Sequence, residues 1–250
     1  MARSHLGDFG PERILVVDDH DLSRRYAVAA LRQSGAAVKA AACPDAAFGL
    51  ALDWRPQVIF VDLRLPGTHG FAWMDRLYVA WPAALPRPRL IVLSASREPV
   101  PHQTPAGTPI DAALLKPAAP DALRRALSPR APPGVRARHR TPRPPLPDPA
   151  LIALFREELT ARLRLLDRLL SERELGRAVP VLHRLIASAR ICRADRLEAQ
   201  LAALRELCRD DAGPDGPQGT AAVANRYYAL REAAAVVARR DAQRSGLPSG

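Results

Sequence analysis

The sequence predicts an α/β domain with a doubly wound, parallel five-stranded sheet, followed by an all-α helical bundle. In the first half of the chain, short apolar runs alternate with helix-like stretches, as in sheets covered by helices on both faces. The second half shows only helical periodicity, and a segment dense in proline and arginine separates the halves. We therefore expect domains over residues 11–127 and 150–241, joined by a linker over residues 128–149.

The strands of the first domain are predicted from continuous apolar runs, which are typical of strands buried on both faces. The runs occupy residues 14–17, 58–61, 90–93 and 113–115, and residues 38–42 are a weaker candidate. Helical spacing marks residues 22–34 and 44–54, and Gly35 is a natural stop for the first of these helices.

The second domain begins with apolar residues at every third or fourth position, which predicts a helix from about residue 150 to 170. Three further helical stretches span roughly residues 178–193, 195–208 and 220–240, and glycines and prolines separate the last two. Four helices joined by short loops favour an up-and-down bundle.

Acidic residues follow two strands of the predicted sheet. Asp18 and Asp19 come directly after the first strand, and Asp62 directly after the third. The carboxyl ends of parallel strands meet at one edge of the sheet, where three carboxylates raise one another's pKa unless a cation is present. Mg²⁺ prefers such oxygen ligands, and a carboxylate beside it can act as nucleophile toward a phosphoryl group.

Ser94 and Lys116 follow two further strands and are expected at the same edge. A hydroxyl and an ammonium there can hold phosphoryl oxygens. The choice of lysine is informative because Lys39 is the only other lysine in a chain that otherwise uses arginine. A compact point charge therefore suits this position better than a planar guanidinium.

These residues together resemble the receiver (response-regulator) domain family over residues 13–127. The matching features are the aspartate pair, the stretch DLRLPGTHG at residues 62–70, the hydroxyl, and the lysine–proline pair at residues 116–117. The resemblance implies a flavodoxin-like fold and phosphoryl acceptance on Asp62. It also implies the remaining roles: Mg²⁺ ligation by Asp18, Asp19, Asp62 and the backbone carbonyl of Arg64, one aspartate acting through water, and phosphoryl contacts from Ser94 and Lys116.

Two features depart from the receiver pattern. Ala113 stands where receivers often carry an aromatic residue that reports phosphorylation. The stretch between Ser94 and Lys116 contains four prolines, whose spacing excludes the helix that receivers normally have there. We therefore expect an intact phosphate site with an altered output face.

His183 is the candidate functional residue of the helical half. At 100° per residue it lies about 200° from Leu185, so we expect it to face solvent, with Ala187 one turn along. The region 149–240 resembles the histidine phosphotransfer (HPt) family, whose histidine typically continues as H-x-x-K-G-[SA]. Here Ile186 replaces the lysine and Ala187 the glycine. The resemblance implies a phosphotransfer role for His183, with Arg184 or Arg190 as substitute charges, and whether it is phosphorylated stays open.

The predicted function is two-component phosphorelay signalling. Asp62 is expected to receive phosphate from a sensor histidine kinase or a phosphorelay protein, and His183 to exchange it with another receiver domain. No kinase ATP-binding motif is visible, so the chain is expected to be a phosphoacceptor and not an enzyme. The cognate kinase and the direction of phosphate flow are left open.

Two alternatives compete with this interpretation. In the first, the bundle is a degenerate docking or dimerisation module with an idle His183, and the missing lysine favours it. The second, a nucleic-acid-binding output domain, would explain the net charge of +11. No helix-turn-helix signature or basic, aromatic-interleaved helix face supports it, and much of the excess charge lies in the linker. A homodimer is compatible with either half.

The chain is expected to be cytoplasmic. Its start lacks the apolar core of a signal peptide, and no apolar run approaches the roughly 18 residues of a membrane span. Cys43, Cys192 and Cys208 form no CxxC pair and are predicted to be reduced, buried thiols.

Overall fold

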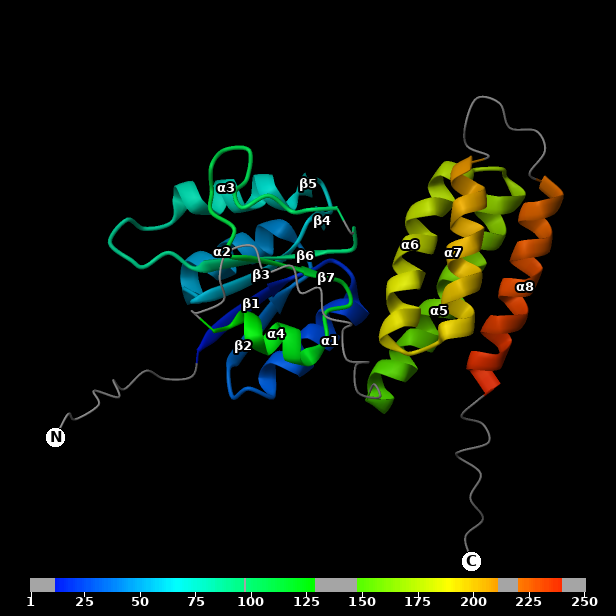
Figure 1. The fold of residues 1–250 in the computed structure, drawn as a ribbon, viewed down its shortest axis with the longest axis horizontal. Coiled ribbons are helices and arrows are strands. Elements are labelled where there is room, and N and C mark those ends of the chain that lie inside the picture. Colours follow the sequence, from blue (N-terminus) through cyan, green and yellow to red (C-terminus); the bar gives the residue numbers. More distant parts are fainter. Residues whose placement is uncertain (1–11, 97, 129–147, 211–219, 240–250) are drawn as a thin grey trace, which may run out of the picture. The chain divides into compact units, whose positions relative to one another are not determined.

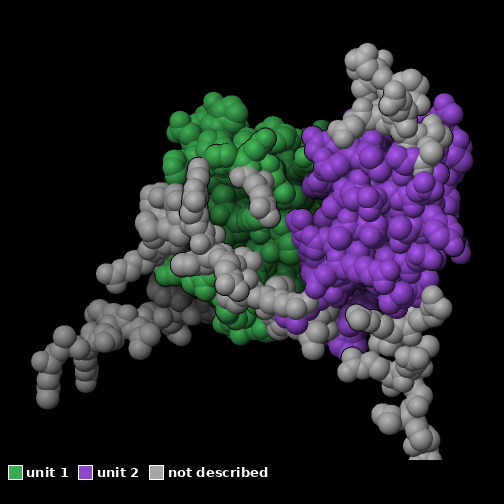
Figure 2. Space-filling model, turned by 45° about the vertical axis from the view of Figure 1, so that its right-hand side comes forward, with its two compact units in different colours: residues 1–144 green, residues 145–250 purple. Residues whose placement is uncertain are grey.

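The computed structural model describes residues 12–96, 98–128, 148–210 and 220–239. Contacts divide the chain into two compact units, residues 1–144 and 145–250 (Figure 2). The predicted linker lies almost entirely outside the described residues, as do the glycines and prolines expected to separate the last two helices.

The first unit contains the predicted parallel five-stranded sheet. Its strand order is β2-β1-β3-β6-β7, in which the connections cross over as doubly wound folds require. The strands are β1 (Arg13–Val17), β2 (Ala37–Ala41), β3 (Val58–Asp62), β6 (Arg89–Ser94) and β7 (Ala112–Leu115). The weaker candidate strand is thus confirmed as β2, and Asp62 is the last residue of β3 instead of the first residue after it.

Helices cover both faces of the sheet (Figure 1). Helices α2 (Pro44–Trp54) and α3 (Gly70–Ala80) lie on one face, and α1 (Asp21–Arg32) and α4 (Pro120–Ala126) lie on the other. Side chains alternate across each strand, so one set packs under α2 and α3. The core on this side includes Leu15, Val17, Ile59 and Val61 of the strands and Trp73 and Met74 of α3, all buried. Gly35, after α1, has a positive φ of 81°, as its predicted role as a stop requires.

The edge strand β7 differs from its prediction. Residues 113–115 were expected to be buried on both faces, but this was wrong: the side chains of β7 are half-buried and Leu115 is 43% exposed. The strand pairs with β6 alone, and the helix that follows it, α4, has only seven residues. Apolar composition could not distinguish an edge strand from a central one.

No helix forms between β6 and β7 in the described part of that stretch, as its prolines predicted. The segment instead turns back on itself through an isolated bridge between Gln103 and Pro109. A second short feature was not predicted at all. The antiparallel pair β4 (Arg64–Leu65) and β5 (Thr68–His69) forms a hairpin directly after β3.

The described residues of the second unit form four helices that contact one another mainly in sequence order. They are α5 (Pro149–Ser171), α6 (Leu175–Ile191), α7 (Asp195–Asp210) and α8 (Thr220–Arg239), which confirms the predicted bundle (Figure 1). Helix α6 starts at Leu175, earlier than the predicted start near residue 178, so Pro180 lies inside the helix. At this position the proline removes its own hydrogen bond to the carbonyl of Gly176, and its ring crowds that carbonyl.

The described helices include none long and apolar enough to cross a membrane. All three cysteines are free thiols, as predicted, but their burial differs. Cys208 is buried and Cys192 half-buried, whereas Cys43 is exposed because it precedes the first turn of α2 at the surface.

Candidate functional site

The three predicted carboxylates meet at the carboxyl edge of the sheet. Asp18 and Asp19 follow β1, Asp62 ends the neighbouring strand β3, and one oxygen of each lies within 4.8 Å of the others. The parallel pairing of β1 with β3 causes this meeting, because it brings both strand ends to the same level. Carboxylate oxygens at this spacing are a donor set for a hard divalent cation.

Asp18 is completely buried and receives three hydrogen bonds. The Ser23 hydroxyl and the Lys116 ammonium each donate to Oδ2 at 2.7 Å, and the backbone amide of His20 donates to Oδ1 at 2.9 Å. Burial alone would raise the pKa of Asp18, but Lys116 and these hydrogen bonds outweigh burial, so the pKa is lowered. Asp18 is therefore a fixed anion within the site.

The Lys116 side chain forms hydrogen bonds with carboxylates at the ends of two neighbouring strands. Its Nζ donates to Oδ2 of Asp18 at 2.7 Å and to Oδ2 of Asp62 at 2.6 Å. Burial alone would lower the pKa of Lys116, but the two carboxylates raise it above its ordinary value. The backbone amide of Lys116 donates to the carbonyl of Ser94 at 2.7 Å, which fixes the start of the side chain.

Asp62 is less well compensated than Asp18. Its Oδ1 accepts from the backbone amide of Arg64 at 3.0 Å, and its Oδ2 accepts from Lys116. Burial raises the pKa of Asp62 and Asp18 raises it further, while Lys116 lowers it only in part. Three carboxylates and one ammonium therefore leave the site with an excess of acidic groups, and Asp62 is the carboxylate whose ionisation is disfavoured.

Ser94 ends β6, the strand that pairs with β3, so it reaches the same edge as predicted. Its side chain is buried and its Oγ accepts from the backbone amide of Ser96 at 3.1 Å. Arg64, the source of the predicted carbonyl ligand, is exposed in β4 two residues after Asp62.

Two positions that sequence reasoning missed hold Asp18 in place. Both lie in the first turn of α1: Ser23 donates to the carboxylate, and Arg24 donates from NH1 to the backbone carbonyl of Asp18 at 2.7 Å. Arg24 also pairs with Asp21. A serine five residues after the first aspartate was the available signal, because a helix starting at residue 21 turns that hydroxyl back toward the strand end.

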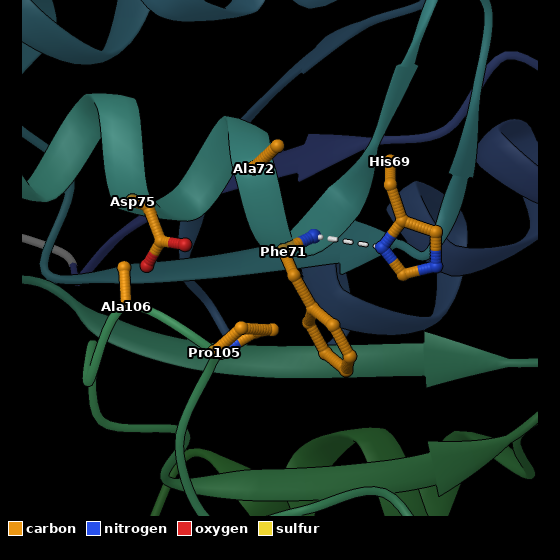
Figure 3. Close-up of a pocket in the computed structure, with 6 residues that line it drawn as sticks. All are labelled: His69, Phe71, Ala72, Asp75, Pro105 and Ala106. Carbon is orange, nitrogen blue, oxygen red and sulfur yellow. Dashed lines mark hydrogen bonds between the residues drawn. The ribbon is translucent and has the colours of Figure 1, made fainter.

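The proline-rich stretch before β7 packs on α3 beside the hairpin. The Thr104 hydroxyl donates to Asp75 of α3, and the Thr104 backbone amide donates to the carbonyl of Thr108 at 2.9 Å. An open cavity of about 480 Å³ lies between the proline-rich stretch and α3 (Figure 3). It is lined by His69, Phe71, Ala72, Asp75, Pro105 and Ala106. Ala113, at the usual aromatic position, is half-buried against the core.

His183 lies in the middle of α6 and is half-buried, so the expected solvent-facing position is only partly correct. Ile186, at the position of the family's lysine, is 3% exposed and belongs to the core. Arg190, one of the two proposed substitute charges, forms an ion pair with Glu198 of α7. Ser188 is buried and donates to Glu158 of α5 at 2.7 Å.

Comparison with protein families matches each unit separately. Residues 14–128 match the response regulator receiver domain and residues 150–233 match the Hpt domain. Solved structures similar to this chain include receiver domains from Methylobacillus flagellatus (21% identity) and of the putative response regulator NarL from Mycobacterium tuberculosis (29%). Each match covers 47% of this chain, and 96% and 94% of the other chain respectively, with a TM-score of 0.41 for both.

The first unit is therefore a response-regulator receiver domain, and the second is an Hpt domain. A chain that joins these two domains belongs to the two-component signalling proteins, and it is a phosphorelay protein.

Proposed function

We propose that Asp62 accepts a phosphoryl group from a phosphohistidine of a partner histidine kinase or phosphorelay protein. The observation that carries this proposal is the ammonium of Lys116, which lies 2.7 Å from Asp18 and 2.6 Å from Asp62 beside the three clustered carboxylates. Asp62 is the carboxylate with the raised pKa and the weaker hydrogen bonding. A nucleophile held close to a fixed cation suits acceptance of an anionic group.

The donor set fits Mg²⁺, the ion that receiver domains bind at this kind of acidic site. We assign Asp19, Asp62 and the backbone carbonyl of Arg64 as its direct ligands. Asp18 already accepts three hydrogen bonds, so we assign it to a metal-bound water. When bound, the ion supplies positive charge that balances the carboxylates and the phosphoryl oxygens.

The transfer itself requires little of the protein beyond placement and charge. An oxygen of Asp62 attacks the phosphorus of the partner's phosphohistidine, so that a phosphorus–oxygen bond forms as the phosphorus–nitrogen bond breaks. The leaving imidazole keeps the electron pair of the broken bond and takes up a proton from solvent. Lys116 turns from the Asp62 carboxylate to the phosphoryl oxygens, and the Ser94 hydroxyl contacts another of them.

Labelling of the full chain by acetyl phosphate tests the proposal. We expect Mg²⁺-dependent, base-labile phosphorylation at Asp62, lost on chelation with EDTA and absent in Asp62→Asn. The conservative variant Asp45→Asn, at an exposed aspartate of α2, is the matched control and should label normally. Equal labelling of Asp62→Asn and the unchanged protein would overturn the assignment.

For the Hpt domain we propose that His183 exchanges phosphate with a receiver domain. The half-buried imidazole in the middle of α6 supports this proposal. A rival function, docking or dimerisation without phosphotransfer, is favoured by the buried Ile186 at the family's lysine position. The ion pair of Arg190 with Glu198 favours the rival as well, because it occupies one of the substitute charges.

Measurement of acid-labile phosphate on the chain distinguishes phosphotransfer by His183 from docking or dimerisation. Mixing the full chain with a phosphorylated receiver should produce phosphohistidine that disappears in His183→Gln, whereas His69→Gln and His102→Gln should retain it. If no phosphohistidine forms and His183→Gln leaves partner binding unchanged, the docking function is correct.

The remaining assignments follow from these roles. The chain acts as a phosphoacceptor in the cytoplasm and depends on a separate kinase for its phosphate, so we assign it no catalytic activity of its own. Kinase-free chain incubated with ATP and Mg²⁺ should therefore remain unlabelled.

A further inference from the structure

Gly70, the first residue of α3, lies directly against the backbone of the phosphoacceptor. A Cβ at this position would lie 2.5 Å from the carbonyl oxygen of Asp62 and 2.9 Å from the Cα of Leu63. Both are backbone atoms, so no flexible side chain can move aside. The other five glycines that the structure describes would meet no atom within 4 Å after the same addition.

The α3 side of this contact is firmly held. The Gly70 amide donates to the carbonyl of Leu63 at 2.9 Å, which keeps the two backbones in contact, and the β4–β5 hairpin pairs Arg64 with His69 immediately before α3. Trp73, one turn further along α3, is buried, and its Nε1 donates to the carbonyl of Pro44 at 2.8 Å. These contacts therefore fix the position of the first turn of α3 beside the end of β3.

The Asp62 side is held less tightly. The Leu63 amide is 3.4 Å from the carbonyl of Leu93, a long hydrogen bond. A side chain at Gly70 would therefore displace the Asp62–Leu63 peptide, and with it the Asp62 carboxylate. Asp18 and the backbone of Lys116 follow other strands, β1 and β7, and would not share this movement.

We infer that Gly70 is a positioning residue: the absence of its side chain determines where the Asp62 carboxylate lies relative to Lys116 and the other aspartates. This inference rests on the proposed function of Asp62 as phosphoacceptor. Misplacement of a reacting group by a fraction of an ångström to one ångström costs up to about a hundredfold in rate. Gly70 acts through the backbone and touches no reacting atom.

Phosphorylation kinetics of the full chain with acetyl phosphate and Mg²⁺ test the inference. In Gly70→Ala we expect a rate constant lowered at least tenfold with an unchanged final extent of labelling. We also expect a several-fold weaker Mg²⁺ affinity by calorimetry. A merely structural role would instead lower the final extent through loss of folded protein and leave the rate constant of the folded fraction unchanged.

Two glycines serve as matched controls. Gly67→Ala strains the same hairpin, because Gly67 has a φ of 73°, but meets no backbone atom. Gly49→Ala stabilises α2, since alanine is the better helix former and the site is open. Both should label at the unchanged rate. If Gly70→Ala does not fold, the Gly49→Ala/Gly70→Ala double variant carries the measurement.

The possible outcomes are distinguishable. A folded Gly70→Ala that labels at the wild-type rate overturns the inference alone, and so does a double variant that still fails to fold, because the glycine then serves the fold. Failure of the wild-type chain to label at Asp62 overturns the proposed function itself.

Discussion

The two candidate phosphoryl sites of this chain differ in how much of their charge is already in place. At the Asp62 site, a buried ammonium contacts two carboxylates, and serine and backbone donors fix one of them. At the His183 site, the expected lysine is a buried isoleucine and one nearby arginine is paired with a glutamate on another helix. The receiver site is preorganised, whereas the Hpt site lacks its usual fixed charge.

This difference shows what each domain can do without its partner. A preorganised site stabilises developing charge without rearrangement, so we expect the receiver to react with a small phosphodonor. For phosphotransfer at His183 we expect the charge to come from Arg184 or from the docked receiver. Substitutions that remove the charge from one site, or supply it to the other, test the comparison directly.

Among these substitutions, Lys116→Met should have the largest effect on the stability of the first domain and on its phosphorylation. It leaves Asp18 buried without its cation, and removing one partner of a buried ion pair costs about 3–5 kcal/mol. We expect a loss of stability of that size in urea unfolding of the first domain. Phosphorylation measured on the remaining folded protein should fall at least tenfold, because the variant lacks the cation that we propose balances the phosphoryl oxygens.

The control for this prediction is Lys39→Met, the same replacement at the other lysine of the chain. The exposed Lys39 lies 4.8 Å from the ring centre of the half-buried Trp54, so its loss should change stability by less than about 1 kcal/mol. Equal stability of the two variants would show that Lys116 is solvated in the folded protein.

Ile186→Lys supplies the family's charge to the Hpt site, but at a core position. Because Ile186 is almost fully buried, we expect the bundle to lose about 2 kcal/mol or more by thermal unfolding. If the domain still folds, the ammonium should raise phosphotransfer to His183. Ala187→Lys, at the half-buried neighbour, is the control that adds charge at lower cost, and equal destabilisation by both would argue against a buried Ile186.

The cluster of Asp18, Asp62 and Lys116 could be predicted from the sequence because its residues follow recognisable strands. A parallel sheet brings strand ends to one edge, so Asp18, Asp62 and Lys116 had to meet once the strands were placed. The proline-rich stretch was also correctly expected to contain no helix, because each proline removes a backbone donor. These predictions used only local composition and one rule of topology.

The missed features depend on packing that local composition does not encode. The exposure of Leu115 follows from the position of β7 at the edge of the sheet, and the burial of Ile186 from the neighbours of α6. The close approach of Gly70 to Asp62 requires the hairpin to be known first. Such details decide how each site works, although they do not change which residues form it.

Asp18→Asn and Asp62→Asn should change the stability of the metal-free receiver in opposite directions. The pKa of Asp18 is lowered, so its ionised form stabilises the fold above the unfolded pKa of 3.8, and its loss should cost about 1–3 kcal/mol. The pKa of Asp62 is raised, so its ionised form destabilises the fold at neutral pH, and Asp62→Asn should be the more stable protein.

The pH dependence of this second effect has a definite sign. A group with a raised folded pKa binds its proton more tightly in the folded state, so its cost is relieved as the pH falls through that value. The stability advantage of Asp62→Asn should therefore be full at pH 7 and shrink as the pH approaches 4. Urea unfolding at several pH values measures it, and an advantage that grows toward acid pH would contradict the raised pKa.

Ser23→Ala should have the smallest effect, and it sharpens the comparison because it measures how far the rigidity of the Asp62 site depends on one hydroxyl. The hydroxyl donates to the fully buried Asp18 at 2.7 Å, so its loss should cost about 1–2 kcal/mol. Asp18 would also be held less rigidly, and Mg²⁺ affinity measured by calorimetry should fall a few-fold. Ser34→Ala, just beyond the other end of α1, removes a hydroxyl bonded only to the carbonyl of Leu31 and should leave Mg²⁺ binding unchanged.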